Sequence, residues 1–167
     1  LRATLRSNPV LSPNGTPPRL VSDAVAVLTS LHTNPGLSIG GPVVLVDLGG
    51  GGTSVTLADS GAAFEPLDET TRVAEFSGDL IDQALLTHVL SGIEDADPGA
   101  TAAVGLLGAR REECRQAKER LSAATATEIP VALPGYRSVV RVTRAELENL
   151  LAEPLQQVLD ELDNLLQ

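Results

Sequence analysis

The sequence predicts an α/β fold, with a mixed sheet, packed helices and a second region made of helices and a hairpin. The first observation is a pair of strand-like runs, residues 43–47 and, after a glycine-rich turn, residues 53–59. A side-chain period of two is typical of strands, and a continuous apolar run is typical of a central strand buried on both faces. The second observation is that helical spacing begins at residue 78 and is interrupted by one more hairpin.

The chain is predicted to contain one partial domain and a leading segment. Residues 7–18, "SNPVLSPNGTPP", are rich in proline, which fixes φ and lacks an N–H, so they cannot sustain a helix or a central strand. Residues 1–18 are therefore predicted to be a linker or the end of a preceding lobe. Residues 19–167 are predicted to form the domain. The sequence has no methionine, which favours an excised, incomplete piece of a longer protein.

The elements before the long helices are short. Apolar residues at Val21, Val25, Leu28 and Leu31 form one stripe at helical spacing, and they predict a helix that a glycine- and proline-rich stretch then ends. After the two strand-like runs, residues 70–76 predict a third extended segment.

Two helices and a hairpin follow. Apolar spacing predicts helices over residues 78–90 and, with many charges, from about 104 to 123. Residues 125–133 and 136–142 are predicted strands, joined by the Pro-Gly turn at 134–135.

The last element is a long helix. Thr143 and Glu146 form a capping box, in which each side chain satisfies a backbone donor at the helix start. Leucines then recur at helical spacing as far as Leu166 without a stop signal. Pro154 lies inside the pattern and is predicted to kink the helix, at a cost of about 3 kcal/mol, unless it opens a second segment.

Composition excludes several classes of function. A net charge of −10 argues against binding nucleic acid or anionic membranes, because both need clustered basic residues. The single cysteine excludes an internal disulfide, and no apolar stretch is long enough for a membrane helix. A cytoplasmic location is expected.

The stretch "DLGGGGTSVT", residues 47–56, is the main functional candidate. No Lys and no helix follow the glycines, so it is neither a P-loop nor a dinucleotide-binding fingerprint. Glycines between strands could adopt positive φ and bring backbone donors close to a phosphate, while Asp47 orients a magnesium-bound water. The alternative is a flexible hairpin tip, with Asp47 making an Asx-turn.

Other candidate residues favour ordinary structural roles. His32 and His88 have no ligand partners nearby in sequence, which argues against a metal site. Cys114 has no paired histidine and is predicted to be a buried structural thiol. Asp79 and Asp82 are predicted to be first-turn acids, favoured by the helix dipole, rather than a catalytic pair.

Four stretches in order resemble the seventy-kilodalton heat-shock (DnaK-type) chaperones. "VVLVDLGGGGTSVTLAD" is similar to the family's second phosphate loop, usually D-L-G-G-G-T-F-D, and "FSGDLIDQALLTHVL" to its G-G-x-D-F-D helix start. "EECRQAKERLSAATATEIPV" resembles A-C-E-R-A-K-R-T-L-S-S-S-T with the strand after it, and "VTRAELENLLAEPLQQVL" resembles I-T-R-A-x-F-E-x-L with its following helix. The resemblance implies the second lobe of the actin-like ATPase (ribonuclease H-like) fold, with a charged-helix and hairpin subdomain at about 77–142.

The resemblance also implies ATP or ADP and Mg²⁺ as cofactors. Asp47 would hold the magnesium water and is the one catalytic candidate, Gly49 to Gly51 would cradle the β- and γ-phosphates, and Lys118 and Ser122 would contact ribose and adenine. Lys118 has the alternative of a solvated helix face, Ser122 of a helix cap, and Gly78 of a strand end rather than a close approach to nucleotide. The implied site residues are Asp47, Gly49, Gly50, Gly51, Gly52, Thr53, Gly78, Lys118 and Ser122.

Departures from the family pattern put hydrolysis in doubt. Where the family has Thr-Phe-Asp, this chain has Gly52, Thr53 and Ser54, so a cation-holding carboxylate is missing and Thr53 serves as the phosphate hydroxyl only if the loop shifts by one. The adenine-side Glu and Arg are exchanged as Arg115 and Glu119, which cannot preserve the same hydrogen bonds.

The family's catalytic Lys, its first phosphate loop and its later G-G-S-x-R-x-P loop have no counterpart in this sequence, and one lobe offers half of the phosphate clamp. The first hypothesis is therefore a nucleotide-binding segment of a divergent DnaK-type chaperone that hydrolyses little ATP alone. Its expected partners are the remaining lobe, the substrate domain, and a co-chaperone or client protein. The second hypothesis is a pseudo-ATPase scaffold for protein interaction. A filament-type actin homologue is the third, and the charged-helix motif speaks against it.

Overall fold

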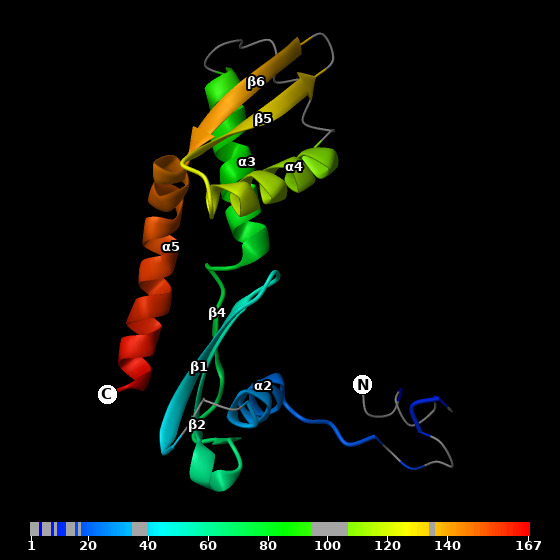
Figure 1. The fold of residues 1–167 in the computed structure, drawn as a ribbon, viewed down its shortest axis with the longest axis vertical. Coiled ribbons are helices and arrows are strands. Elements are labelled where there is room, and N and C mark those ends of the chain that lie inside the picture. The colour runs from blue at the N-terminus through cyan, green and yellow to red at the C-terminus, as the bar shows by residue number, and fades with distance from the viewer. Residues whose placement is uncertain are drawn as a thin grey trace. The chain divides into compact units, whose positions relative to one another are not determined.

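The computed structural model describes residues 4, 8, 10–12, 16, 18–34, 40–94, 107–133 and 136–167. Most of the predicted linker at 1–18, the start of the predicted helix at 104–123 and the turn at 134–135 lie outside the described residues. The elements, labelled as in Figure 1, are α2 Asp23–His32, β1 Pro42–Leu48, β2 Thr53–Asp59, the 3-10 helix η2 Ser60–Ala62, β3 Glu65–Pro66, β4 Thr71–Val73, α3 Gly78–Glu94, α4 Leu107–Leu121, β5 Ala126–Leu133, β6 Tyr136–Thr143 and α5 Arg144–Leu165.

The chain forms two compact units, which are described separately. The first unit contains Leu1–Leu45 and Thr56–Glu69, and the second contains Val46–Val55 and Thr70–Gln167. This division does not test the predicted boundary between a linker at residues 1–18 and a domain at residues 19–167, which stays a prediction. The glycine turn and the other predicted site residues all belong to the second unit.

The first unit has a small apolar core under α2. Buried Leu28, Ala58 and Phe64 pack together, with Val43 and Leu45 against them. Helix α2 begins after Ser22, whose hydroxyl accepts a hydrogen bond from the amide of Val25 at 3.3 Å, as a helix N-cap does. The predicted apolar stripe thus leads to a helix, and Leu28 is the residue of α2 that is fully buried.

The prediction that β1 is a central strand buried on both faces is wrong. Its residues are half-buried or exposed, and β1 stands at the end of the strand order β1-β2-β3. Val43 and Leu45 pack on the first unit's core, and Val44 and Val46, which alternate with them, are half-buried as well. An apolar run indicates a doubly covered strand only where layers cover both faces, and among the described residues β1 has one core cluster and one neighbouring strand.

Within the described residues, β2 pairs antiparallel with β3 and β4, and β5 with β6, so the predicted mixed sheet is seen as antiparallel pairs. Strand β2 pairs with β3 at Ala58–Pro66 and with β4 at Thr53–Val73. Strands β5 and β6 pair from Ala126–Thr143 to Leu133–Tyr136, which confirms the predicted hairpin.

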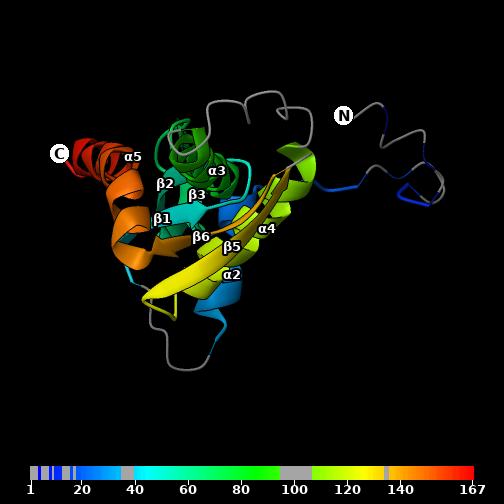
Figure 2. The same ribbon diagram turned by 90° about the horizontal axis from the view of Figure 1, so that it is seen from above.

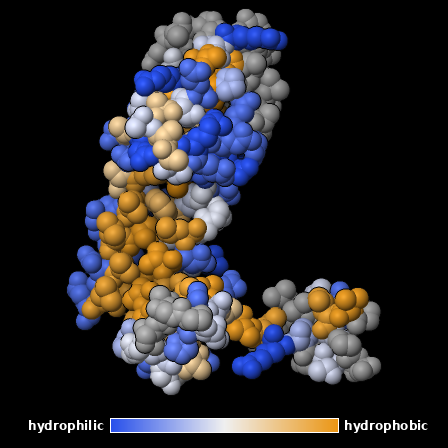
Figure 3. All heavy atoms as spheres, in the orientation of Figure 1, coloured by the Kyte–Doolittle hydropathy of each residue, from blue (hydrophilic) through white to orange (hydrophobic). Residues whose placement is uncertain are grey.

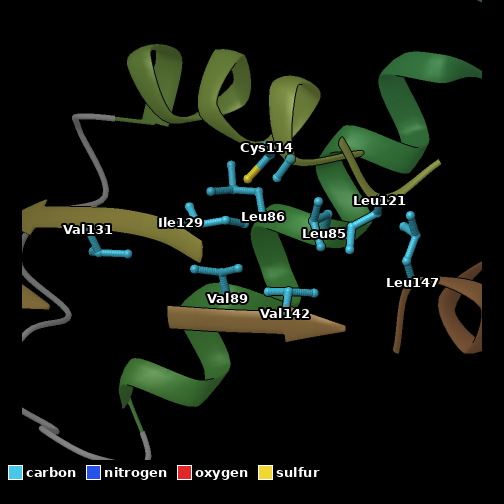
Figure 4. Close-up of a cluster of buried hydrophobic side chains, with 10 residues drawn as sticks. Leu85, Leu86, Val89, Cys114, Leu121, Ile129, Val131, Val142 and Leu147 are labelled. Atoms are coloured by element: carbon cyan, nitrogen blue, oxygen red, sulfur yellow. The ribbon is translucent and has the colours of Figure 1, made fainter. Parts of the chain in front are cut away.

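The second unit has the larger core. Helices α3 and α4, the β5–β6 hairpin and the start of α5 surround one cluster, and Figures 1 and 2 show these elements packed together. Figure 4 shows the cluster's side chains converging between the helices and the hairpin. Cys114 is 1% exposed in it, which confirms the buried thiol. The cluster consists of Leu85, Leu86, Val89, Cys114, Ala117, Leu121, Ile129, Val131, Val142 and Leu147.

Helix α5 begins as predicted. The hydroxyl of Thr143 accepts from the amide of Glu146 at 3.2 Å, and the Glu146 carboxylate accepts from the amide of Thr143 at 2.7 Å. The Glu146 carboxylate also accepts from the hydroxyl of Thr143 at 2.6 Å, and the hydrogen bonds that it accepts from this hydroxyl and from the Thr143 amide lower the pKa of Glu146 below its ordinary value. The helix continues through Pro154 as a single element to Leu165.

Candidate functional site

The glycine turn between β1 and β2 leaves backbone donors available. The amide of Gly49 donates to the carbonyl of Gly52 at 2.9 Å and closes the turn. The amides of Gly50, Gly51 and Gly52 have no acceptor among the described residues. Successive backbone amides of this kind can bind an anion. The donors that the phosphate hypothesis requires are therefore present.

The turn does not use positive φ, so that expectation is wrong. The glycine with positive φ in the described part of the chain is Gly41, at 75°, not one of the turn's glycines. Gly49 is required for a different reason: a Cβ on it would lie 2.8 Å from the carbonyl oxygen of Gly52. A Cβ on Gly50 or Gly51 would meet nothing within 4 Å. The turn therefore requires glycine at its first position, Gly49, whereas a side chain would fit at Gly50 and Gly51.

The turn's carbonyls bind the start of α3. The amide of Gly78 donates to Gly49 O at 3.1 Å, and the amide of Asp79 donates to Gly50 O at 2.8 Å. The next amide, that of Leu80, donates to the hydroxyl of Ser77 at 3.2 Å. The first donors of α3 are therefore used inside the protein. A phosphate would meet the turn's own amides rather than the helix N-terminus.

Lys118 is not on a solvated helix face. Its Nζ lies 2.7 Å from Asp82 Oδ1, and the Asp82 side chain is 8% exposed against 23% for Lys118. The same Nζ donates to the carbonyl of Gly78 at 3.1 Å. The ion pair joins α4 to the first turns of α3. Asp82 is thus a structural partner and not a first-turn acid, a role that in the structure belongs to Asp79.

The Lys118 ammonium group and the glycine turn both lie close to Gly78. A Cβ on Gly78 would lie 3.2 Å from Gly50 Cα and 3.5 Å from Lys118 Nζ. No larger residue would fit there without a shift of the turn or of the lysine. The close approach that the sequence left open at Gly78 is therefore made to the protein's own backbone and to Lys118.

The two remaining candidates on the phosphate side, Thr53 and Asp47, differ in exposure. Thr53 is 1% exposed, and its hydroxyl has no hydrogen-bond partner in the described residues. Asp47 is exposed at the end of β1, and its carboxylate makes no hydrogen bond or ion pair within the described part of the chain. No group of three or more His, Cys, Asp or Glu among the described residues could hold a metal ion. A metal at Asp47 would therefore need water or phosphate oxygens as its other ligands.

The adenine-side candidates on α4 interact within their own helix. The hydroxyl of Ser122 donates to Glu119 O at 2.6 Å, as the helix-cap interpretation predicts. Arg115 binds Glu112 and Glu119, each at 2.6 Å. These contacts raise the pKa of Arg115 and lower the pKa of Glu112 to about 2. Hydrophilic side chains dominate the part of the molecule around α4 in Figure 3.

A polar cleft lies between α3 and α4 beside these residues. Its volume is about 250 Å³, and charged side chains of both signs line it. Its polar lining suits a charged or hydrogen-bonding group better than an apolar one. The lining residues are Asp79, Asp82, Arg111, Glu112 and Arg115.

Comparison with known families identifies the chain. Antiparallel strand pairs, packed helices and a glycine turn after β1 define an α/β protein. The family described as Hsp70 protein matches residues 28–167. This match covers most of the chain, so the chain belongs to the Hsp70 family, whose fold is that of the actin-like ATPases. A comparison with curated proteins gave no match. None of the described helices is both long and apolar enough to cross a membrane.

Sequence reasoning missed Asp82 as a member of the site. The signal available was an acid four residues after Gly78, one turn into the predicted helix. An acid one turn into a helix is usually solvated, and only the packing of α3 against α4 turns this one toward the lysine.

Proposed function

We propose that this chain binds ATP or ADP with Mg²⁺ as the nucleotide-binding segment of a divergent DnaK-type chaperone. The observation that carries the proposal is the set of unpaired amides at Gly50, Gly51 and Gly52 beside Lys118. Family membership over residues 28–167 supports the same conclusion, because chaperones of this family bind ATP. The chain would correspond to the second lobe, with its helical and hairpin subdomain at about 77–142.

The residues predicted on the phosphate side have these roles in the proposal. Gly49 and Gly78 shape the turn, and the amides of Gly50 to Gly52 bind phosphate oxygens. Asp47 binds a magnesium water, which suits Mg²⁺ because this ion keeps several waters and takes one or two carboxylates. Thr53 would reach a phosphate only after its buried hydroxyl became accessible. Hydrolysis by this chain alone would be weak, since one exposed carboxylate and one turn do not surround the transferred phosphate.

The wider setting follows from the family and is proposed with it. Residues 1–18 would be a linker or the end of a preceding lobe, and the remaining lobe and the substrate domain of the whole protein would be the first partners. A co-chaperone or client protein and a cytoplasmic location are expected of a chaperone of this family.

Calorimetric titration of the chain with MgATP tests the proposal. We expect saturable binding at millimolar nucleotide, about −4 kcal/mol, because one lobe supplies half of the contacts. Asp47→Asn should reduce the dependence on magnesium, with Asp59→Asn as a control at the end of the neighbouring strand β2. Binding that is unchanged by Asp47→Asn removes that residue from the site. Absence of binding at millimolar MgATP contradicts the proposal.

A pseudo-ATPase scaffold is the second candidate. The ion pairs of Arg115 with Glu112 and Glu119 favour it, because they occupy the groups that stand where the family contacts adenine. In that case the titration gives no heat while the protein stays folded.

A further inference from the structure

We propose that the second half of α5, together with a groove at the middle of this helix, forms a docking surface for a basic amphipathic helix of a partner protein. The surface includes neither the glycine turn nor α4, so its test is independent of the proposed nucleotide binding. A stripe of exposed leucines and the negative charge around it carry the proposal.

The exposed leucines of α5 lie beyond the core of the second unit. That core takes Leu147 from α5, with Leu150 and Leu151 packed against it. Figures 1 and 2 show α5 continuing past α3, α4 and the hairpin. Four further leucines follow at steps of four, three and four residues, so they share one face of the helix. They are Leu155 at 42% exposed, Leu159 at 45%, the half-buried Leu162, and Leu166 at 63%.

The same half of α5 also has a covered side. Val158 is 4% exposed, although it lies between Leu155 and Leu159 in sequence. The helix therefore packs along one line and leaves the stripe beside that line open within the described residues. An exposed apolar patch of this kind marks a site of interaction, because water is a poor neighbour for several leucines together.

A groove adjoins the start of the stripe. Its volume is about 370 Å³, and it lies between α3, α5 and the segment after β4. Glu75 is the charged residue of an otherwise apolar lining, and Leu80, which also lines the groove, is 44% exposed. A groove of this size and character accepts an apolar anchor side chain. The lining residues on α5 are Leu150, Leu151 and Pro154, which precede Leu155.

The charge of α5 determines the chemistry of the partner. Arg144 is its basic residue, and its guanidinium donates to the carbonyls of Ser122 and Ala124, at the hairpin end of the helix. The last turn has no basic residue, although the helix dipole adds partial negative charge there. A partner that covers the leucines therefore needs Lys or Arg beside its own apolar face. The acidic residues of α5 are Glu146, Glu148, Glu153, Asp160, Glu161 and Asp163.

A helix is the form of partner that fits this stripe. Side chains at steps of four and three residues form ridges that pack against a second helix with the same spacing. Two copies of this chain would bring two acidic α5 helices together, and like charges facing each other cost free energy. A basic helix replaces that repulsion with attraction. The occupant is therefore an amphipathic helix with large apolar residues on one side and Lys or Arg at the border.

Fluorescence anisotropy with two labelled synthetic helices tests the inference. Both peptides carry leucines at positions i, i+3, i+4 and i+7, flanked by lysines in one peptide and by glutamates in the other. We expect the lysine peptide to bind saturably, at least about tenfold more tightly than the glutamate peptide. Equal affinities, or no binding of the lysine peptide, overturn the proposal. Sedimentation of the chain alone adds a further test: a dimer that Leu159→Gln converts to a monomer assigns the stripe to a second copy and also overturns the proposal.

Variants of α5 locate the surface. Leu159→Gln should weaken binding of the lysine peptide about tenfold, whereas Val139→Gln, at a residue of β6 that is 59% exposed, should leave it unchanged. Leu155→Gln tests the stripe again if the first variant does not fold. Asp163→Asn should weaken binding about threefold and reduce its dependence on salt, with Glu128→Gln on β5 as the control. Unchanged affinity in all three α5 variants overturns the assignment of this surface.

Discussion

Two cations on α4 have opposite environments although they are three residues apart in one charged sequence. Lys118 binds a carboxylate that is 8% exposed, and its own side chain is 23% exposed. Arg115 is 46% exposed and is shared by Glu112 and Glu119, whose side chains are 52% and 58% exposed. Exposed pairs are screened and contribute little, whereas a pair that is largely removed from water must be kept intact. The surroundings, more than the residue type, decide which cation can organise a site.

The largest effect is expected from removing the carboxylate of the buried pair. Asp82→Ala leaves the Lys118 ammonium without its partner and should lower the free energy of unfolding by about 3 kcal/mol, at the low end for buried pairs because Lys118 can still reach water. Urea unfolding measures the loss. Glu112→Ala is the matched control on the exposed side and should lower the unfolding midpoint much less, because exposed pairs contribute little. If Asp82→Ala lowers the free energy of unfolding no more than the control does, the claimed difference between Lys118 and Arg115 is contradicted.

A smaller effect is expected where Lys118 meets the turn. Gly92→Ala in α3 has nothing within 4 Å of the added Cβ, and it should stabilise the protein by about 0.5–1 kcal/mol, as alanine does in a helix. Gly78→Ala, in the same helix, places its Cβ 3.2 Å from Gly50 Cα and should give no gain or a loss. Thermal unfolding of the two variants compares them directly. An equal gain at both positions would mean that the turn is not packed against α3.

The smallest effect concerns the exposed pair in acid. The hydrogen bonds from Arg115 lower the pKa of Glu112 from 4.5 to about 2. Since the folded pKa lies below the ordinary one, the contribution of this pair is complete above pH 4.5 and is lost as the pH falls toward 2. Carboxyl carbon NMR of Glu112 against pH measures the value. Added salt should raise this pKa toward 4.5, because the pair is exposed. A pKa that salt does not move would contradict the screened character of this pair.

Local signals in the sequence predicted most of the second unit. The capping box at Thr143 and Glu146 and the hairpin around 134–135 depend on residues close in sequence, so their patterns are sufficient. The burial of β1 was not predictable in the same way, because it depends on which layers cover each face. The apolar pattern of Val43, Val44, Leu45 and Val46 is the same whether one face or both are covered.

The candidate site was predicted in part. The glycine stretch was found as a phosphate candidate from its composition, but the role of Gly78 follows from close contacts with Gly50 and Lys118, which are distant from it in sequence. The pairing of Asp82 with Lys118 depends on how α3 and α4 pack together. Spacing along a single helix cannot show such a contact.

The central claim is that the amides of Gly50, Gly51 and Gly52 bind the phosphates of a nucleotide. Amide NMR of the chain during titration with MgATP tests it most directly, with the amide of Gly92, near the other end of α3, as an internal reference. The account predicts that the signals of Gly50 to Gly52 shift together and saturate in the millimolar range, while that of Gly92 stays in place. Signals of Gly50 to Gly52 that remain still at saturating MgATP would contradict it.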